Sequence, residues 1–99
     1  MTDGTPPQRP PVRLRYVLFY ENGDIALAAE NFPAHQARYI EFMRRGVLAS
    51  LGPFTDQGGA MAVFTSPESA EEFAAADPFV LNGVVSKWYI REWREATPL

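Results

Sequence analysis

The chain contains no cysteine and only one histidine, His35, among its 99 residues. The absence of cysteine excludes disulfides, thiolate nucleophiles and cysteine-based metal sites. A zinc site of the usual kind would need three carboxylate ligands beside the single imidazole, so we expect neither a metal nor another cofactor.

The sequence also lacks an apolar run near the ~20 residues that a membrane-spanning helix requires. Its N-terminus has no charged-then-apolar layout of a secretory signal, so we expect a cytoplasmic protein. The formal net charge is −3 and the basic residues are scattered. This argues against nucleic acid and membrane surfaces as partners.

The length suffices for one small domain with one core. Residues 1–12 hold four prolines without apolar periodicity, which predicts a flexible proline-rich tail, with a ligand for a proline-recognition module as the alternative. Residues 13–99 then form the folded α+β domain.

Alternating and helical patterns predict four strands and two helices within this domain. The strands are expected at 13–21, 47–54, 60–65 and 84–93, and the helices at 33–46 and 66–77. Pro33 suits a first helical turn, Gly46 a left-handed stop and Ser66 an N-cap. Residues 25–30 stay open between a loop and a helical lead-in. The order β-α-β-β-α-β predicts a ferredoxin-like fold, a four-stranded antiparallel sheet with two helices on one face.

Large apolar side chains fall on both faces of the first and last strands. Val17 and Phe19 alternate with Leu18 and Tyr20, and the last strand repeats this pattern, with Val85, Tyr89 and Trp93 expected on its second face. Helices cover only one face in this fold, so the other needs a cover. The pattern predicts a homodimer that packs two sheets face to face, as in a dimeric α+β barrel. The alternative is a ligand pocket within one monomer.

Chain direction predicts that three polar residues meet at one end of the sheet. They are His35 in the first turn of the first helix, Asp56 in the loop between the middle strands, and Asp77 at the end of the second helix. An aspartate bonded to one ring nitrogen would fix the tautomer and leave the other nitrogen free. The alternative is a capping histidine and an Asp-Pro helix stop.

Helical spacing places His35, Tyr39, Phe42 and Met43 on one face, which we expect to meet the sheet. The dipole of the first turn would disfavour imidazolium, keeping His35 available as a neutral base.

Several of these segments together resemble the YciI-like (YCII-related) family of small dimeric α+β barrel proteins. They are RYVLFY, PAHQARYIEFMRRGVLASLGPF, SPESAEEFAAADPFVLNGVV and IREW, spanning roughly residues 14–95. The resemblance implies a His–Asp pair in a cleft, formed by His35 and Asp77, and it places Asp56 in a segment where relatives often carry polar residues. It also implies action on small organic molecules, with elimination from hydroxylated aromatics as one example.

The leading hypothesis is therefore a cofactor-independent enzyme, lyase- or isomerase-like, that uses His35 and Asp77 for acid–base chemistry on a small, partly apolar molecule. Candidate substrate-binding residues are Tyr16, Tyr20, Phe54, Asp56, Phe79 and Trp88. One alternative is a non-catalytic small-molecule-binding or accessory protein. Another is a cofactor-free monooxygenase, an idea that rests on fold analogy.

Overall fold

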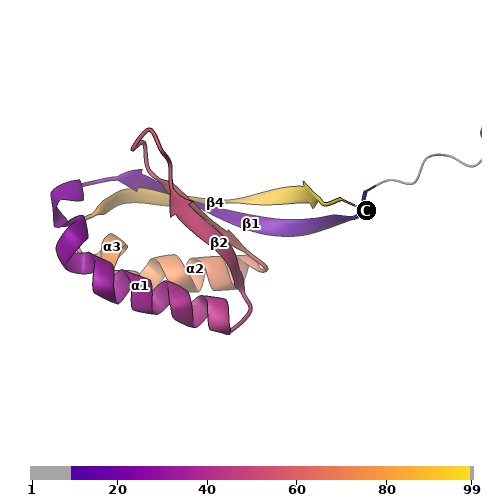
Figure 1. Cartoon of the computed structure of the whole chain (residues 1–99), viewed down its shortest axis with the longest axis horizontal. Coiled ribbons are helices and arrows are strands. Elements are labelled where there is room, and N and C mark those ends of the chain that lie inside the picture. Colours follow the sequence, from indigo (N-terminus) through magenta and orange to yellow (C-terminus); the bar gives the residue numbers. More distant parts are fainter. Residues whose placement is uncertain (1–9, 99) are drawn as a thin grey trace, which may run out of the picture.

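The computed structural model describes residues 10–98, and these form one sheet with helices on a single side (Figure 1). The predicted tail falls mostly on residues 1–9, which lie outside the described residues. The elements are β1 (Val12–Asn22), η1 (Ile25–Leu27), α1 (Ala28–Arg44), β2 (Leu48–Pro53), β3 (Ala60–Phe64), α2 (Pro67–Ala76), α3 (Pro78–Leu81) and β4 (Val85–Ala96). The predicted strands match within three residues at each end.

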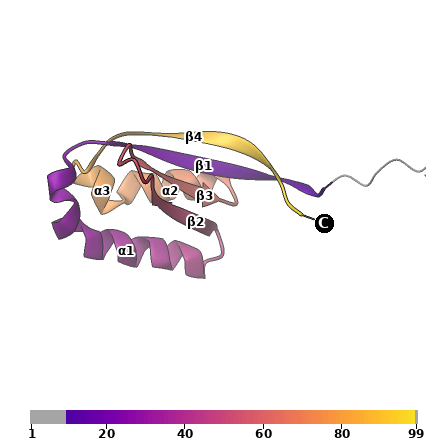
Figure 2. The same ribbon diagram turned by 45° about the horizontal axis from the view of Figure 1, so that its top comes forward.

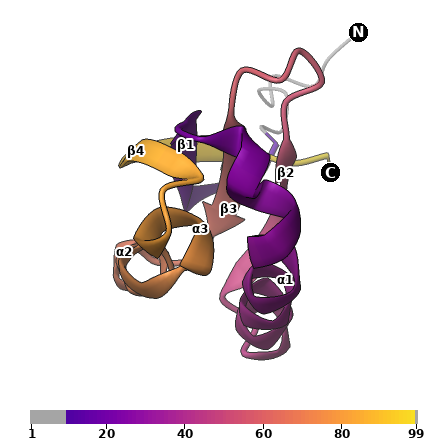
Figure 3. The same cartoon turned by 90° about the vertical axis from the view of Figure 1, so that its left-hand side faces the viewer.

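The four strands are antiparallel in the order β2-β3-β1-β4. Figure 2 shows the helices beneath the sheet, and Figure 3 shows α1 beside the α2–α3 segment on the same side. This confirms the predicted ferredoxin-like arrangement. No helix within residues 10–98 is long and apolar enough to cross a lipid bilayer.

Strand β1 is paired with β4 along its whole length but with β3 only from Tyr16 to Tyr20. The outer halves of β1 and β4 therefore form a two-stranded ribbon that extends beyond the helices (Figure 1). The helices cover only the part of the sheet in which β1 also pairs with β3, and the core lies between that part and the helices.

Three phenylalanines form the centre of this core, one each from α1, β3 and α2. The rings of Phe42, Phe64 and Phe73 lie 5.2–6.4 Å apart by centroid, and all three side chains are almost fully buried. Burial of aromatic rings at this spacing gives a favourable apolar contact between the helices and the sheet.

The predicted start of the first helix is wrong, because α1 begins at Ala28 rather than at Pro33. The Asp24 carboxylate accepts a hydrogen bond from the backbone of Ala26 and caps η1, which continues into α1. His35 therefore lies two turns inside the helix. The dipole effect, confined to the first turn, does not apply to it. The predicted end is confirmed, since Gly46 is left-handed at φ +75°.

Two residues lie elsewhere than the simple periodicities predict. Val85 packs in the core with Leu18, because the β1–β4 register shifts at Glu21 and Asn22 and leaves Ser86 as an extra residue. Such a bulge moves the following side chain to the opposite face. Met43, predicted to face the sheet, is 38% exposed.

Candidate functional site

His35 and Asp77 form a direct hydrogen bond at the end of the helical layer where α1 begins. The distance from Nδ1 of His35 to Oδ1 of Asp77 is 2.7 Å. Asp77 is fully buried and His35 is 8% exposed. Because a carboxylate only accepts hydrogen bonds, the proton of this bond belongs to Nδ1.

Asp77 lies at the junction of two helices, where it ends α2 and caps α3. Its backbone is extended, as expected before Pro78, and Oδ1 also accepts from the backbone N–H of Phe79 at 3.2 Å. The predicted end of the second helix at Asp77 is thus confirmed. The short α3 was not predicted, although Asp-Pro is itself a typical helix start.

The second carboxylate oxygen of Asp77 is bound by Tyr20 on the central strand β1. The phenol hydroxyl donates to Oδ2 at 2.5 Å. Burial, followed by the negative charge of Asp77 and this bond, raises the pKa of Tyr20 far above its ordinary value. The Tyr20 hydroxyl is therefore a neutral, permanent donor to Asp77.

His35 lines a cavity of about 450 Å³ between the sheet and α1, and Nε2 is the ring nitrogen that is not bound to Asp77. No hydrogen-bond partner of Nε2 occurs among residues 10–98, whereas every buried side-chain nitrogen and oxygen in that range has one. Nε2 is thus not a buried atom, and it carries the free lone pair of this tautomer. The arrangement can accept a proton from a molecule in the cavity.

Aromatic rings hold the imidazole in place from several sides. The ring of Phe79 stacks on that of His35 at 3.8 Å between centroids, with an interplanar angle of 4°. Tyr39 and Phe73 approach the imidazole edge-on at 5.4 and 6.2 Å. With Nδ1 tied to Asp77, these contacts leave the ring little freedom to rotate.

The cavity wall is largely apolar and comes from β1, α1, β2, β3, α2 and α3. It is lined by Leu18, Tyr20, Ala28, Phe32, His35, Tyr39, Leu51, Gly52, Pro53, Ala60, Met61, Ala62, Phe73 and Phe79. His35 is the one nitrogen-containing or charged side chain in this lining. The Tyr39 hydroxyl is a further polar group and accepts a bond from Gln36 at 3.3 Å.

Of the six predicted substrate-binding residues, the structure brings only Tyr20 and Phe79 to the cavity wall. Trp88 lies on the same face of the sheet and packs against the core, and Tyr16 donates to Glu92 at 3.2 Å. Phe54 is partly exposed and absent from the lining.

Asp56 does not join the His35–Asp77 pair as predicted. It is exposed in the loop between β2 and β3, and its carboxylate accepts from the backbone N–H of Gly58 at 2.8 Å. This local turn occupies the side chain, which is a common use of aspartate in loops. Within the part of the chain that the structure describes, no three metal-ligating side chains of His, Asp or Glu type cluster together.

Sequence reasoning missed Phe32 and the Gly52–Pro53 pair as cavity residues. Phe32 precedes His35 by three residues and Tyr39 by seven, so helical spacing carries a signal for it once the true start of α1 is known. Gly52 and Pro53 enter the wall through the pairing of β2 with β3, which local sequence does not reveal.

Comparisons with known proteins agree with this architecture. The structure is similar to that of 5-chloro-2-hydroxyhydroquinone dehydrochlorinase (TftG) from Burkholderia phenoliruptrix AC1100, solved in complex with 2,5-dihydroxybenzoquinone. The TM-score is 0.65 at 18% sequence identity, covering 80% of this chain and 92% of that chain. At this identity the likeness concerns the fold alone. No curated protein sequence matches significantly.

The family comparison covers most of the chain. Residues 14–94 match the YCII-related domain, and this range includes both members of the buried pair and nearly all of β1 and β4. The chain therefore belongs to the YCII-related domain family.

Proposed function

We propose that this protein is a cofactor-independent enzyme that uses His35 as an acid–base catalyst on a small, partly apolar organic molecule. One observation carries the proposal: Nδ1 of His35 is bound to the buried Asp77, while the same ring lines an apolar cavity and Nε2 has no partner among residues 10–98. Positioned proton transfer of this kind typically contributes ~10²- to 10⁴-fold to a rate.

In the proposed reaction, Nε2 of His35 removes a proton from the bound molecule. The imidazolium that forms is stabilised by the Asp77 carboxylate, whose oxygens are already oriented by Tyr20 and the Phe79 backbone. If the same nitrogen returns the proton to another atom of the molecule, the reaction is an isomerisation. If a leaving group instead departs with its bonding electrons and the imidazolium passes the proton to solvent, the reaction is an elimination.

The cavity supports a small, partly apolar substrate because hydrocarbon and aromatic surface dominates its wall. A phenol or an enolisable carbonyl compound is a suitable substrate for a single imidazole base, because the proton that the base must remove is already acidic. The similar fold of a dehydrochlorinase supports elimination from a hydroxylated ring as the first reaction to test.

The test measures chloride release from 5-chloro-2-hydroxyhydroquinone by wild type and His35→Gln, with Glu41→Gln as the control from the exposed side of the same helix. We expect His35→Gln to lose at least about 10²-fold in turnover and Glu41→Gln to retain it. Unchanged turnover in His35→Gln would contradict the proposal. A panel of phenols that raises the melting temperature of wild type without any turnover would favour the non-catalytic binding alternative.

We further propose that the protein is a homodimer through the open face of the sheet. On that face Tyr89 and Trp93 are 41% and 44% exposed, and Phe19 stacks on Tyr89 at 5.2 Å. A groove of about 280 Å³ runs between Val17, Phe19, Met61, Arg91, Glu92 and Trp93. Exposed aromatics beside a groove are typical of an interface.

Light scattering on Trp93→Glu tests the dimer, with Ile40→Glu as a control that places the same charge on the exposed side of α1. We expect Trp93→Glu to yield monomer while Ile40→Glu keeps the mass of wild type. A monomeric wild type would overturn this proposal without affecting the catalytic one.

A further inference from the structure

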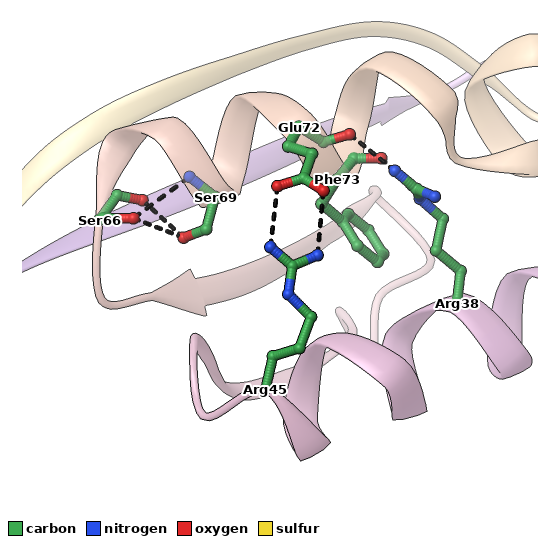
Figure 4. A network of polar contacts seen from close by, with 6 residues as sticks. All are labelled: Arg38, Arg45, Ser66, Ser69, Glu72 and Phe73. Carbon is green, nitrogen blue, oxygen red and sulfur yellow. Dashed lines mark hydrogen bonds and ion pairs between the residues drawn. The ribbon is translucent and has the colours of Figure 1, made fainter.

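Arg38 connects α1 to the last turn of α2, one helical turn beyond His35. Its Nε donates to the carbonyl oxygen of Phe73 at 3.1 Å, and its terminal amine donates to the carbonyl oxygen of Glu72 at 2.7 Å (Figure 4). The guanidinium thus binds backbone rather than another side chain. The two carbonyl oxygens that it binds are held in place by α2 itself.

The position of this contact matters because the carbonyl end of a helix carries partial negative charge. Arg38 places a full positive charge there, four residues before Asp77. The guanidinium also lies near two core rings, at 4.9 Å from the centroid of Phe42 and 5.7 Å from that of Phe73. The side chain is therefore held on both its polar and its flat surfaces.

The two elements that Arg38 joins are the two that supply the buried pair. His35 projects from α1 one turn before Arg38, and Asp77 is the residue that ends α2. A shift of α2 along α1 would lengthen the bond between Nδ1 and Oδ1. We propose that Arg38 is a positioning residue of the site, which keeps Asp77 within hydrogen-bonding distance of His35 by binding the carbonyl end of α2.

The charge of Arg38 also reaches the far side of the pair. Among the groups that act on Tyr20, it is the one that opposes the rise in the pKa of that hydroxyl.

Arg45 offers a matched comparison on the same face of α1. It lies seven residues later, its guanidinium is 4.3 Å from the centroid of Phe42, and it binds the Glu72 carboxylate through two bonds of 2.9 Å (Figure 4). Arg38 and Arg45 thus contact the same ring and the same helix. Only Arg38 binds the backbone of the α2 end, so only its loss should be transmitted to Asp77.

The experiment uses ¹⁵N NMR of the imidazole, which is unambiguous because an untagged chain has one histidine. It compares wild type, Arg38→Met and Arg45→Met in two readouts: the tautomer of His35 and the solvent exchange of its Nδ1 proton. We expect Arg38→Met to speed this exchange at least about tenfold, since two charge-assisted bonds that oppose opening are lost. The Nε2-protonated tautomer should also become detectable. Arg45→Met should match wild type in both.

Equal exchange and equal tautomer populations in the Arg38→Met and Arg45→Met proteins would overturn the inference. If Arg38→Met does not fold, Arg38→Lys replaces it, because lysine keeps the charge but cannot bridge both carbonyls with a planar fork. Exchange in Arg38→Lys equal to that of wild type would then overturn it. The inference rests on the proposed function for its catalytic meaning, but both readouts are independent of turnover. A negative result in the turnover assay would therefore not affect the NMR test of Arg38.

Discussion

Tyr20 and Asp77 are joined by a hydrogen bond of 2.5 Å that connects the central strand of the sheet to the junction of two helices. The sequence interpretation placed Tyr20 among the candidate substrate-binding residues. The structure shows that its hydroxyl is already used, so the ring faces the cavity while the oxygen supports the carboxylate. Tyr20, Asp77 and His35 form a chain of three polar groups that ends at Nε2.

The first prediction removes the hydroxyl that supports Asp77. Tyr20→Phe should lower the free energy of unfolding by about 1.5–3 kcal/mol, the usual contribution of a hydrogen bond to a charged group. Urea denaturation measures this change, and Tyr89→Phe is the control because Tyr89 is 41% exposed. Equal losses in the two variants would show that the Tyr20–Asp77 bond adds nothing beyond an ordinary surface hydroxyl.

The second prediction concerns alkaline pH. The pKa of Tyr20 in the folded chain lies above the ordinary value of about 10 that the unfolded chain has. Above that pH the unfolded state binds fewer protons than the folded state. The contribution of Tyr20 to the free energy of unfolding is therefore fully present below pH ~10. It falls as the pH rises further, by at most ~1.4 kcal/mol per pH unit for one group.

Denaturation of wild type and Tyr20→Phe between pH 8 and 11.5 isolates this dependence, because the other titrating groups are common to both proteins. The difference in their unfolding free energies should be constant up to pH ~10 and shrink above it. A difference that stays constant throughout would mean that Tyr20 titrates normally in the folded chain.

The third prediction exchanges the carboxylate for an amide. In Asp77→Asn one side-chain position becomes a donor, so one of the two groups that donate to it, Tyr20 or His35, is left unpaired. We expect a loss of about 1–3 kcal/mol in stability and a shift of His35 towards the Nε2-protonated tautomer, measured by ¹⁵N chemical shifts. An unchanged tautomer would show that the aromatic contacts alone fix the imidazole.

Local chemistry explains how much of this structure the sequence could predict. Strand alternation, the Ser66 cap with Pro67 after it, the Gly46 stop and the Asp77–Pro78 break are all set by residues close in sequence. Together with chain direction they predict the fold and the meeting of His35 with Asp77.

The errors arose where longer-range packing decides the outcome. Pro33 looks like a helix start, but the Asp24 cap and the alanines after it extend α1 by five residues, and Pro33 is accommodated inside. Asp56 follows the same chain-direction argument as Asp77. Asp56 differs because its carboxylate accepts a hydrogen bond from a backbone N–H within its own loop. No periodicity in the sequence distinguishes Asp56 from Asp77 in this respect.

The last prediction tests a close approach beneath Tyr20. Gly59 has φ +121°, and a Cβ there would lie 2.2 Å from the carbonyl oxygen of Tyr20. Gly59→Ala should therefore combine backbone strain of ~1–3 kcal/mol with displacement of β1, and so disturb the Tyr20–Asp77 bond.

Gly46→Ala is the matched control, because Gly46 is also left-handed at φ +75° but a Cβ there meets nothing within 4 Å. We expect it to lose only ~1–2 kcal/mol from conformation and to leave the exchange of the His35 Nδ1 proton unchanged, whereas Gly59→Ala should accelerate that exchange. If both alanines destabilise equally and neither alters the exchange, the close approach of Gly59 to the Tyr20 carbonyl does not influence the Tyr20–Asp77 bond, and the prediction is wrong.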